Sequence, residues 1–123
     1  MSPRNLCSLD FYQDWEDEKK AFYMSFLPLD KAYSFNPVTK IKEDKILSHI
    51  LGAQACSPTV FIKNEAELEY LVFPRLLALA ECMWTKKENK KFSDFEKRLK
   101  KQKNYFNKEK EQPKIDLVRI KTK

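Results

Sequence analysis

Asn64–Thr85 reads NEAELEYLVFPRLLALAECMWT, and this stretch decides the fold. Its apolar side chains recur at spacings of three and four residues, which predicts a helix from about Glu65 to Thr85 with one wide apolar face. Asn64 is a candidate N-cap, and Glu67 has the capping-box spacing. Pro74 lies inside the run and lacks a backbone N–H, so we expect it to kink the helix or divide it in two.

On the C-terminal side, a second helix is predicted from about Phe92 to Tyr105, with Ser93 as a possible cap. Its apolar residues fall on one side and its lysines on the other; the apolar ones are Phe92, Phe95, Leu99 and Phe106. Residues 108–123 form a basic tail, in which the alternation from Ile115 to Ile120 is compatible with an edge strand or with a loose chain.

On the N-terminal side, residues 6–12 and 49–56 are apolar runs, and each is predicted to form a short buried strand. Asp10 lies near the carboxyl end of the first, and the small residues at 52, 53 and 55 suit a crowded interior. We expect charged or polar loops at 14–20 and 39–49, and an irregular connection at 26–38 with one helical turn after Pro28. This α/β pattern buries little surface by itself.

The composition fits one small domain and excludes several classes of site. The chain has 123 residues with 42% apolar residues, and Gly52 is its only glycine, which excludes a P-loop or a dinucleotide-binding loop. Three cysteines and one histidine, Cys7, Cys56, Cys82 and His49, lack zinc-site spacing, so we expect buried free thiols, no metal and no cofactor. No signal peptide or membrane span is predicted, and localisation is left open.

Charge is unevenly distributed along the sequence. Residues 1–85 carry 9 Lys/Arg against 12 Asp/Glu, a net charge of −3, whereas residues 86–123 carry 15 against 6, a net charge of +9. A lysine-rich segment with interleaved aromatic residues can bind nucleic acid, but the same spacing serves an amphipathic helix with a solvated face. We therefore regard a nucleic-acid partner as the less favoured interpretation.

Four sequence blocks resemble glycoside hydrolase family 20, the β-N-acetylhexosaminidases. Ser2–Gln13 (SPRNLCSLDFYQ) is similar to the family's S-P-T-S-H-C-Y-x-D-Y-Y-Q, and Pro28–Val38 (PLDKAYSFNPV) to P-L-E-K-V-Y-S-F-D-P-V. Ile50–Ile62 (ILGAQACSPTVFI) resembles I-L-G-A-Q-A-C-L-W-T-E-Y-I. Asn64–Thr85 resembles E-x-E-Y-M-x-F-P-R-L-x-A-L-A-E-x-x-W-T, and Phe95–Leu99 matches a following F-x-x-R-L.

The resemblance implies part of a (β/α)8 TIM barrel: its last two strands and their helices, followed by a C-terminal helix and the basic tail. Residues 1–107 would be the C-terminal portion of the catalytic barrel, and residues 108–123 the tail. Because such a barrel needs about 250 residues and builds its active site from the ends of several strands, this chain would supply only one part of it.

The resemblance also implies a damaged sugar site. The family's Y-x-D tyrosine contacts the sugar's acetamide oxygen, and Ser8 stands there, whereas the aspartate that binds sugar hydroxyls is retained as Asp10. Pro58 replaces the tryptophan that stacks on the sugar, and Val60 replaces a glutamate that also binds sugar hydroxyls. Asp10 is thus the one candidate substrate-binding residue, unless it is a strand-end carboxylate satisfied by backbone amides. Arg75 and Glu81, in the helix block, are expected to pair with groups elsewhere in a full barrel.

No catalytic residue is assigned. In the family the substrate's acetamide attacks the anomeric carbon, and an Asp-Glu pair on an earlier strand assists it. Adjacent acids occur here at Glu16-Asp17-Glu18 and Glu43-Asp44, within charged stretches, where we expect solvated surface charges. Asp17-Glu18 has the family's residue order, but it follows the Y-x-D segment instead of preceding it.

Three functional hypotheses follow. The first is a truncated or degenerate β-N-acetylhexosaminidase that is inactive alone. The second is the C-terminal piece of a split or longer active enzyme, in which another polypeptide supplies the rest of the barrel and the complete site binds an N-acetylhexosamine-containing glycan. The third is a basic helical module that binds nucleic acid.

Overall fold

The computed structural model describes residues 3–13, 23–38, 44–59 and 62–106. The helices are α1 (Arg4–Cys7), α2 (Leu29–Tyr33), α3 (Asp44–Leu47), α4 (Glu65–Val72), α5 (Arg75–Trp84) and α6 (Phe92–Phe106), and a 3-10 turn, η2, covers Lys87–Asn89. The strands are β1 (Phe11–Tyr12) and β2 (Tyr23–Phe26). The described chain is therefore α/β with a small sheet.

Three parallel segments lie side by side, and the first apolar run provides the middle one. β1 pairs with β2 in parallel, with Phe11 opposite Tyr23. On the other side, Ser8 forms an isolated parallel bridge with Cys56, and the Leu9 amide donates to the Cys56 carbonyl at 2.7 Å. The segment of residues 8–12 therefore lies in the middle of the three.

The prediction of a strand over residues 6–12 is correct in burial but too long. Leu6 and Cys7 belong to α1, which begins after Pro3, and only Phe11 and Tyr12 form a named strand. Every residue from Cys7 to Tyr12 is nonetheless buried. The α1 turn uses its carbonyls locally, because the Ser8 amide donates to the Arg4 carbonyl.

The prediction of a second buried strand over residues 49–56 is wrong for most of its length. Only Cys56 joins a bridge, while Leu51 is 99% exposed and a Cβ atom placed on Gly52 would meet no atom within 4 Å. A strand needs neighbours to receive its backbone hydrogen bonds and cover its apolar side chains. The described residues offer such a neighbour only at Cys56. The expected loop at 39–49 likewise contains α3, and residues 39–43 lie outside the described part.

The long predicted helix is confirmed as two helices. The Glu67 amide donates to the Asn64 side chain at 2.9 Å, and the Glu67 carboxylate accepts from the Lys63 amide. α4 ends at Val72 and α5 begins at Arg75, so Pro74 divides the run as expected. The helical turn after Pro28 is also confirmed, as α2.

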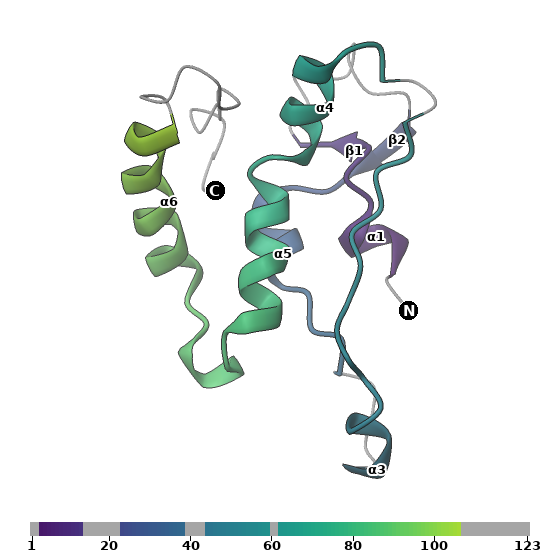
Figure 1. Cartoon of the computed structure of the whole chain (residues 1–123), viewed down its shortest axis with the longest axis vertical. Coiled ribbons are helices and arrows are strands. Elements are labelled where there is room, and N and C mark those ends of the chain that lie inside the picture. The colour runs from purple at the N-terminus through teal and green to yellow at the C-terminus, as the bar shows by residue number, and fades with distance from the viewer. Residues whose placement is uncertain (1–2, 14–22, 39–43, 60–61, 107–123) are drawn as a thin grey trace.

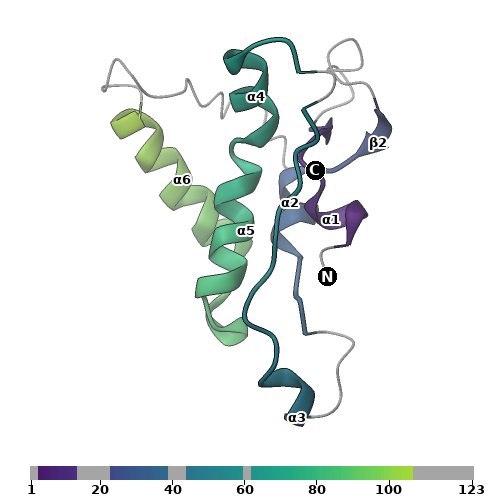
Figure 2. The same cartoon turned by 45° about the vertical axis from the view of Figure 1, so that its right-hand side comes forward.

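The core lies where α5 covers the central segments. Figures 1 and 2 show α5 between α6 on one side and α2 with the strands on the other. Buried residues from every layer meet there, including Leu9, Leu27, Ala32, Tyr33, Ala78, Leu79, Phe95 and Leu99. The predicted second helix is confirmed as α6, but Ser93 lies inside it instead of capping it. The predicted charged loop at 14–20 and the basic tail fall outside the described residues.

Candidate functional site

Asp10 lies at the point where the central segment passes from its bridge with Cys56 to its pairing with β2. Its side chain is buried with 6% exposure, and its Oδ1 atom has no hydrogen-bond partner in the described residues. No backbone amide of the described residues donates to this oxygen. A buried carboxylate oxygen without a donor is costly, so this atom is an unsatisfied acceptor within the described residues.

The other positions expected to touch a sugar are Ser8, on the same segment as Asp10, and Pro58 and Val60, which follow Cys56. Ser8 forms an isolated bridge with Cys56, and Asp10 and Pro58 each lie two residues further along their own segments. Ser8 is buried and Pro58 is exposed, and neither presents an aromatic ring or a carboxylate. Val60 lies outside the described residues. Asp10 is therefore the only carboxylate among these described positions.

Ser57 adds a second unsatisfied polar atom to this region. Its Oγ atom is buried and makes no hydrogen bond within the described residues. Ser57 follows Cys56, the residue that forms the bridge with Ser8. Sequence reasoning missed Ser57, because a serine in a mixed segment gives no signal of burial.

Arg75 links the segments around Asp10 through hydrogen bonds to their backbone carbonyls. Its side chain has 0% exposure and donates to the backbone carbonyls of Leu9, Phe11, Leu27 and Leu71, with 2.9 Å from Nη1 to the Phe11 oxygen. Burial lowers the pKa of Arg75 to about 9, and the negative charge of Asp10 opposes that change. Arg75 therefore remains a cation at neutral pH.

Glu81 forms a second polar cluster, between α5 and α6. Its carboxylate accepts from the Tyr33 hydroxyl at 2.9 Å and forms an ion pair with Arg98. Burial, with the hydrogen bond and charge of Glu81, raises the pKa of Tyr33 to about 12, and the same carboxylate raises the pKa of Arg98. We expected Arg75 and Glu81 to find partners elsewhere in a barrel, but the structure places partners for both within this chain.

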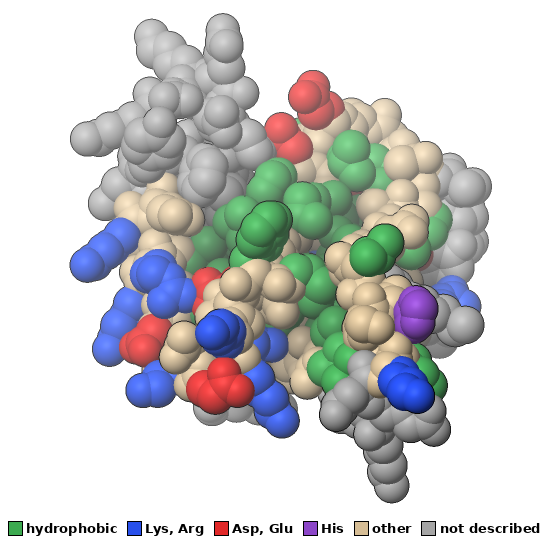
Figure 3. Space-filling view, turned by 60° about the horizontal axis from the view of Figure 1, so that its bottom comes forward, with side chains coloured by type: hydrophobic (Ala, Val, Ile, Leu, Met, Phe, Trp, Pro, Cys, Tyr) green, Lys and Arg blue, Asp and Glu red, His purple; other side chains and the backbone are tan. Residues whose placement is uncertain are grey.

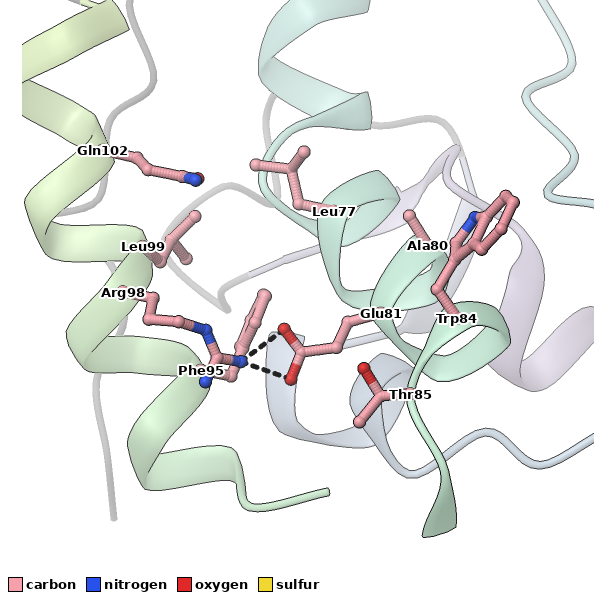
Figure 4. Close-up of a pocket in the computed structure, with 9 residues that line it drawn as sticks. All are labelled: Leu77, Ala80, Glu81, Trp84, Thr85, Phe95, Arg98, Leu99 and Gln102. Carbon is pink, nitrogen blue, oxygen red and sulfur yellow. Dashed lines mark hydrogen bonds and ion pairs between the residues drawn. The ribbon is translucent and has the colours of Figure 1, made fainter. Parts of the chain in front are cut away.

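The Glu81–Arg98 pair lines a groove of about 290 Å³ between α5 and α6. Figure 4 shows Leu77 and Leu99 on opposite walls, and Trp84 pointing away from α6. Because Tyr33 and Arg98 both engage Glu81, this carboxylate is not free to act as a proton donor to a ligand. The groove thus has the features of a helix–helix contact and not of a catalytic centre.

Within the described residues, no three His, Cys, Asp or Glu side chains gather closely enough to hold a metal ion. None of the described helices is both long and apolar enough to cross a membrane. The paired acids Glu16-Asp17-Glu18 and Glu43 lie outside the described residues, and Asp44 begins α3.

Comparison with known proteins identifies relatives over most of the chain. A family model described as "Glycosyl hydrolase family 20, catalytic domain" matches residues 1–87. A beta-hexosaminidase of Porphyromonas gingivalis is 34% identical over 74% of this chain, and one of Vibrio furnissii is 30% identical over 65%. The chain spans only 12% and 13% of the length of these two relatives.

A solved structure gives the same result for the fold. The family 20 exo beta-N-acetylglucosaminidase from Vibrio harveyi, in complex with N-acetylglucosamine, superimposes with a TM-score of 0.72 and 30% identity. The similarity covers 86% of this chain and 17% of that enzyme. The expectation drawn from the four sequence blocks is confirmed at the level of the family.

Proposed function

Since the chain belongs to glycosyl hydrolase family 20, we propose that it forms the closing part of a β-N-acetylhexosaminidase barrel and that alone it hydrolyses no glycoside. The match over residues 1–87 and the parallel alignment of three segments support this assignment. Residues 1–107 form the barrel portion in this proposal, with the strands near residues 8–12 and 56 as its last two. Residues 108–123 form the basic tail.

One observation carries the proposal of inactivity. Asp10 is the only buried carboxylate in the described residues, and Glu81 is held by Tyr33 and Arg98. Glycoside hydrolysis needs a general acid besides the group that attacks or orients at the anomeric carbon. A lone carboxylate without an acid partner can bind a sugar hydroxyl, and we assign that role to Asp10.

The replaced neighbours weaken that binding as well. Ser8 and Pro58 offer neither a phenol nor an indole at the positions beside Asp10. A polar contact missing from a sugar site costs a few kcal/mol, and losing an aromatic platform costs about 1 kcal/mol more. The chain alone therefore lacks most of the contacts that a terminal N-acetylhexosamine requires.

A chromogenic N-acetylglucosaminide assay tests this proposal. The purified chain and its Asp10→Ala variant should both release chromophore at the rate of buffer, while the Vibrio furnissii beta-hexosaminidase serves as the positive control. Turnover by the chain that Asp10→Ala removes would refute the proposal of inactivity and leave the family assignment intact.

We further propose that another polypeptide supplies the rest of the barrel, and that only the completed barrel binds an N-acetylhexosamine-containing glycan. The exposed apolar side chains support this partner: Leu51 is 99% exposed and Trp84 is 90% exposed. Figure 3 shows apolar side chains gathered in the middle of one face, with Lys and Arg side chains on both sides of them. Isolated exposed leucines are ordinary, but a fully exposed one beside an open Gly52 fits an uncovered interface.

A further inference from the structure

Cys82 and Lys90 meet where the chain turns from α5 toward α6. The Lys90 Nζ atom lies 3.1 Å from the Cys82 Sγ atom. The thiol also lies 3.0 Å from the Tyr33 carbonyl oxygen, which fits a hydrogen bond donated by the sulfur. A primary amine and a thiol are therefore held in contact by the fold, outside the region around Asp10.

Three contacts hold the Lys90 amine in place. Nζ donates to the Phe35 carbonyl at 3.1 Å and to the Cys82 sulfur, and it lies 5.1 Å above the Tyr33 ring centroid. A surface lysine normally keeps its ammonium in water and samples many rotamers. Lys90 instead aims its nitrogen at a sulfur with 8% exposure, so the two reacting atoms are already positioned.

We propose that Cys82 and Lys90 form an oxidation site, in which a peroxide converts the contact into a covalent sulfur–nitrogen bond. The product is a sulfenamide that links the end of α5 to the segment before α6. No residue of the sugar-binding region takes part, so this inference does not depend on the proposed function.

The reaction balances in two steps. In the first, the Cys82 thiolate attacks hydrogen peroxide: an S–O bond forms, the O–O bond breaks, and hydroxide leaves and takes up the thiol proton as water. The sulfur is oxidised to a sulfenic acid and the peroxide is reduced. In the second, unprotonated Nζ attacks that sulfur: an S–N bond forms, the S–O bond breaks, and the departing hydroxide takes one proton from Nζ. The sum consumes one peroxide, releases two waters and leaves the chain two hydrogen atoms lighter.

The surroundings of Cys82 slow its oxidation but favour the cross-link to Lys90 as the product. Burial raises the pKa of the Cys82 thiol, whereas the hydrogen bond and the positive charge of Lys90 oppose that rise. The negative charge of Glu81 adds to the rise in the pKa of Cys82. The thiolate of Cys82 becomes more abundant as pH rises, so cross-linking should accelerate from neutral toward alkaline pH. Cys56 is exposed, and its oxidation products form without the geometry that Cys82 has.

Peptide mass spectrometry tests the proposal on the full chain. After hydrogen peroxide treatment, blocked free thiols and trypsin digestion, the peptides 76–86 and 88–91 should appear joined and lighter by two hydrogens. Met83 lies in the first peptide and can add one oxygen, so fragmentation must locate the link at Cys82 and Lys90. Because proximity raises the effective concentration of the amine, the joined peptide should be at least about tenfold more abundant in buffer than in concentrated urea.

Lys90→Arg is the matched control, because it keeps the cation but removes the nucleophilic amine. This variant should give no joined peptide and should instead accumulate a sulfenic acid at Cys82 that dimedone traps. Cys56→Ser should leave the link unchanged, and Cys82→Ser should abolish it. Recovery of Cys82 only as free thiol or as sulfinic acid, with Lys90 still cleaved by trypsin, would overturn the inference.

Discussion

The Arg75 side chain connects three segments that are far apart in the sequence. Its guanidinium donates to carbonyls of Leu9 and Phe11 in the central segment, of Leu27 after β2, and of Leu71 in α4. Guanidinium has several donors in a rigid planar arrangement, which suits it to such a set of acceptors. Arg75 therefore connects the segments of the sheet region through their backbone carbonyls, and none of these hydrogen bonds goes to a side chain.

Replacing Arg75 with methionine should destabilise the chain strongly. Methionine fills a similar volume, but the carbonyls lose their donor and Asp10 loses the nearby charge that offsets its own. We expect a loss of roughly 3 kcal/mol or more in the free energy of unfolding, measured by urea denaturation.

Arg98→Met is the control for that measurement. Arg98 pairs with Glu81, but its side chain is 55% exposed. Water screens such a pair, so its loss should cost only about 0–1 kcal/mol. Equal losses for the two variants would contradict the structural role assigned to Arg75.

Tyr33 predicts a dependence of stability on alkaline pH. Its pKa is raised to about 12 from 10.0, so the unfolded chain releases this proton at lower pH than the folded chain does. The stabilisation is complete below pH 10 and is lost as pH rises toward 12, by up to about 2–3 kcal/mol. Urea denaturation across this range should show the decline, and Tyr33→Phe should flatten it. A decline that persists in Tyr33→Phe would assign the effect to another group.

The sequence predicted the residue types at these sites better than their contacts. The resemblance retained Asp10 and marked Arg75 and Glu81, yet it expected the last two to pair outside the chain. The partners of Arg75 are backbone carbonyls, which carry no signature in an amino-acid sequence. The Cys82–Lys90 contact likewise depends on how the turn before α6 folds back over Tyr33.

Among the elements, α4 is the one most completely specified by its own sequence. Asn64 accepts from the Glu67 amide, and Glu67 reaches back to the Lys63 amide, one residue earlier than in the usual capping box. The acidic first turn, with Glu65 and Glu67, complements the positive end of the helix. Capping and periodicity are local properties, which explains why this helix and its division at Pro74 were predicted correctly.

Asn64→Ala should remove the cap and destabilise the chain by about 1 kcal/mol. Urea denaturation measures the loss, and hydrogen exchange of the first amides of α4 should accelerate with it. Lys86→Ala is the control, because Lys86 is exposed and makes no cap hydrogen bond before η2. An unchanged exchange rate at the Glu67 amide would show that Asn64 does not hold this end.

The two apolar runs show the limit of local reasoning. Residues 6–12 and 49–56 have similar apolar character, yet one is buried and the other is largely exposed. The difference comes from neighbours: residues 8–12 lie between β2 and Cys56, whereas residues 49–55 have no strand beside them in the described part of the chain. Burial of a strand is a property of the sheet around it, and a sequence pattern alone does not supply that sheet.

The described part of the chain has one buried core and also several large apolar side chains that are exposed. α5 contributes to both, since Ala78 and Leu79 are buried while Leu76 and Trp84 are exposed. Residues 53–55 and α5 also line a pocket of about 140 Å³, together with the buried Cys7 and Phe35. A surface of this kind is stable in water only at a cost that a covering partner would relieve.

Adding the rest of a family 20 barrel should therefore stabilise the chain through this surface. We expect co-expression with the earlier barrel strands of the Porphyromonas gingivalis relative to yield a complex that co-purifies and unfolds at a higher temperature than the chain alone. Leu51→Ser should leave the isolated chain within about 0.5 kcal/mol of its original stability, because Leu51 is already exposed. In the complex the same substitution places a hydroxyl in an apolar contact, so it should lower the midpoint of thermal unfolding.

Lys45→Ser is the matched control for that experiment, since Lys45 is also exposed but offers no apolar side chain. It should change neither the isolated chain nor the complex. The comparison distinguishes two roles of an exposed leucine. If Leu51 is only tolerated on a surface, its substitution changes stability equally in the isolated chain and in the complex. If Leu51 belongs to an interface, its substitution lowers stability only in the complex. Equal behaviour of Leu51→Ser and Lys45→Ser in the complex would therefore exclude residues 50–55 from the contact, whatever holds the two polypeptides together.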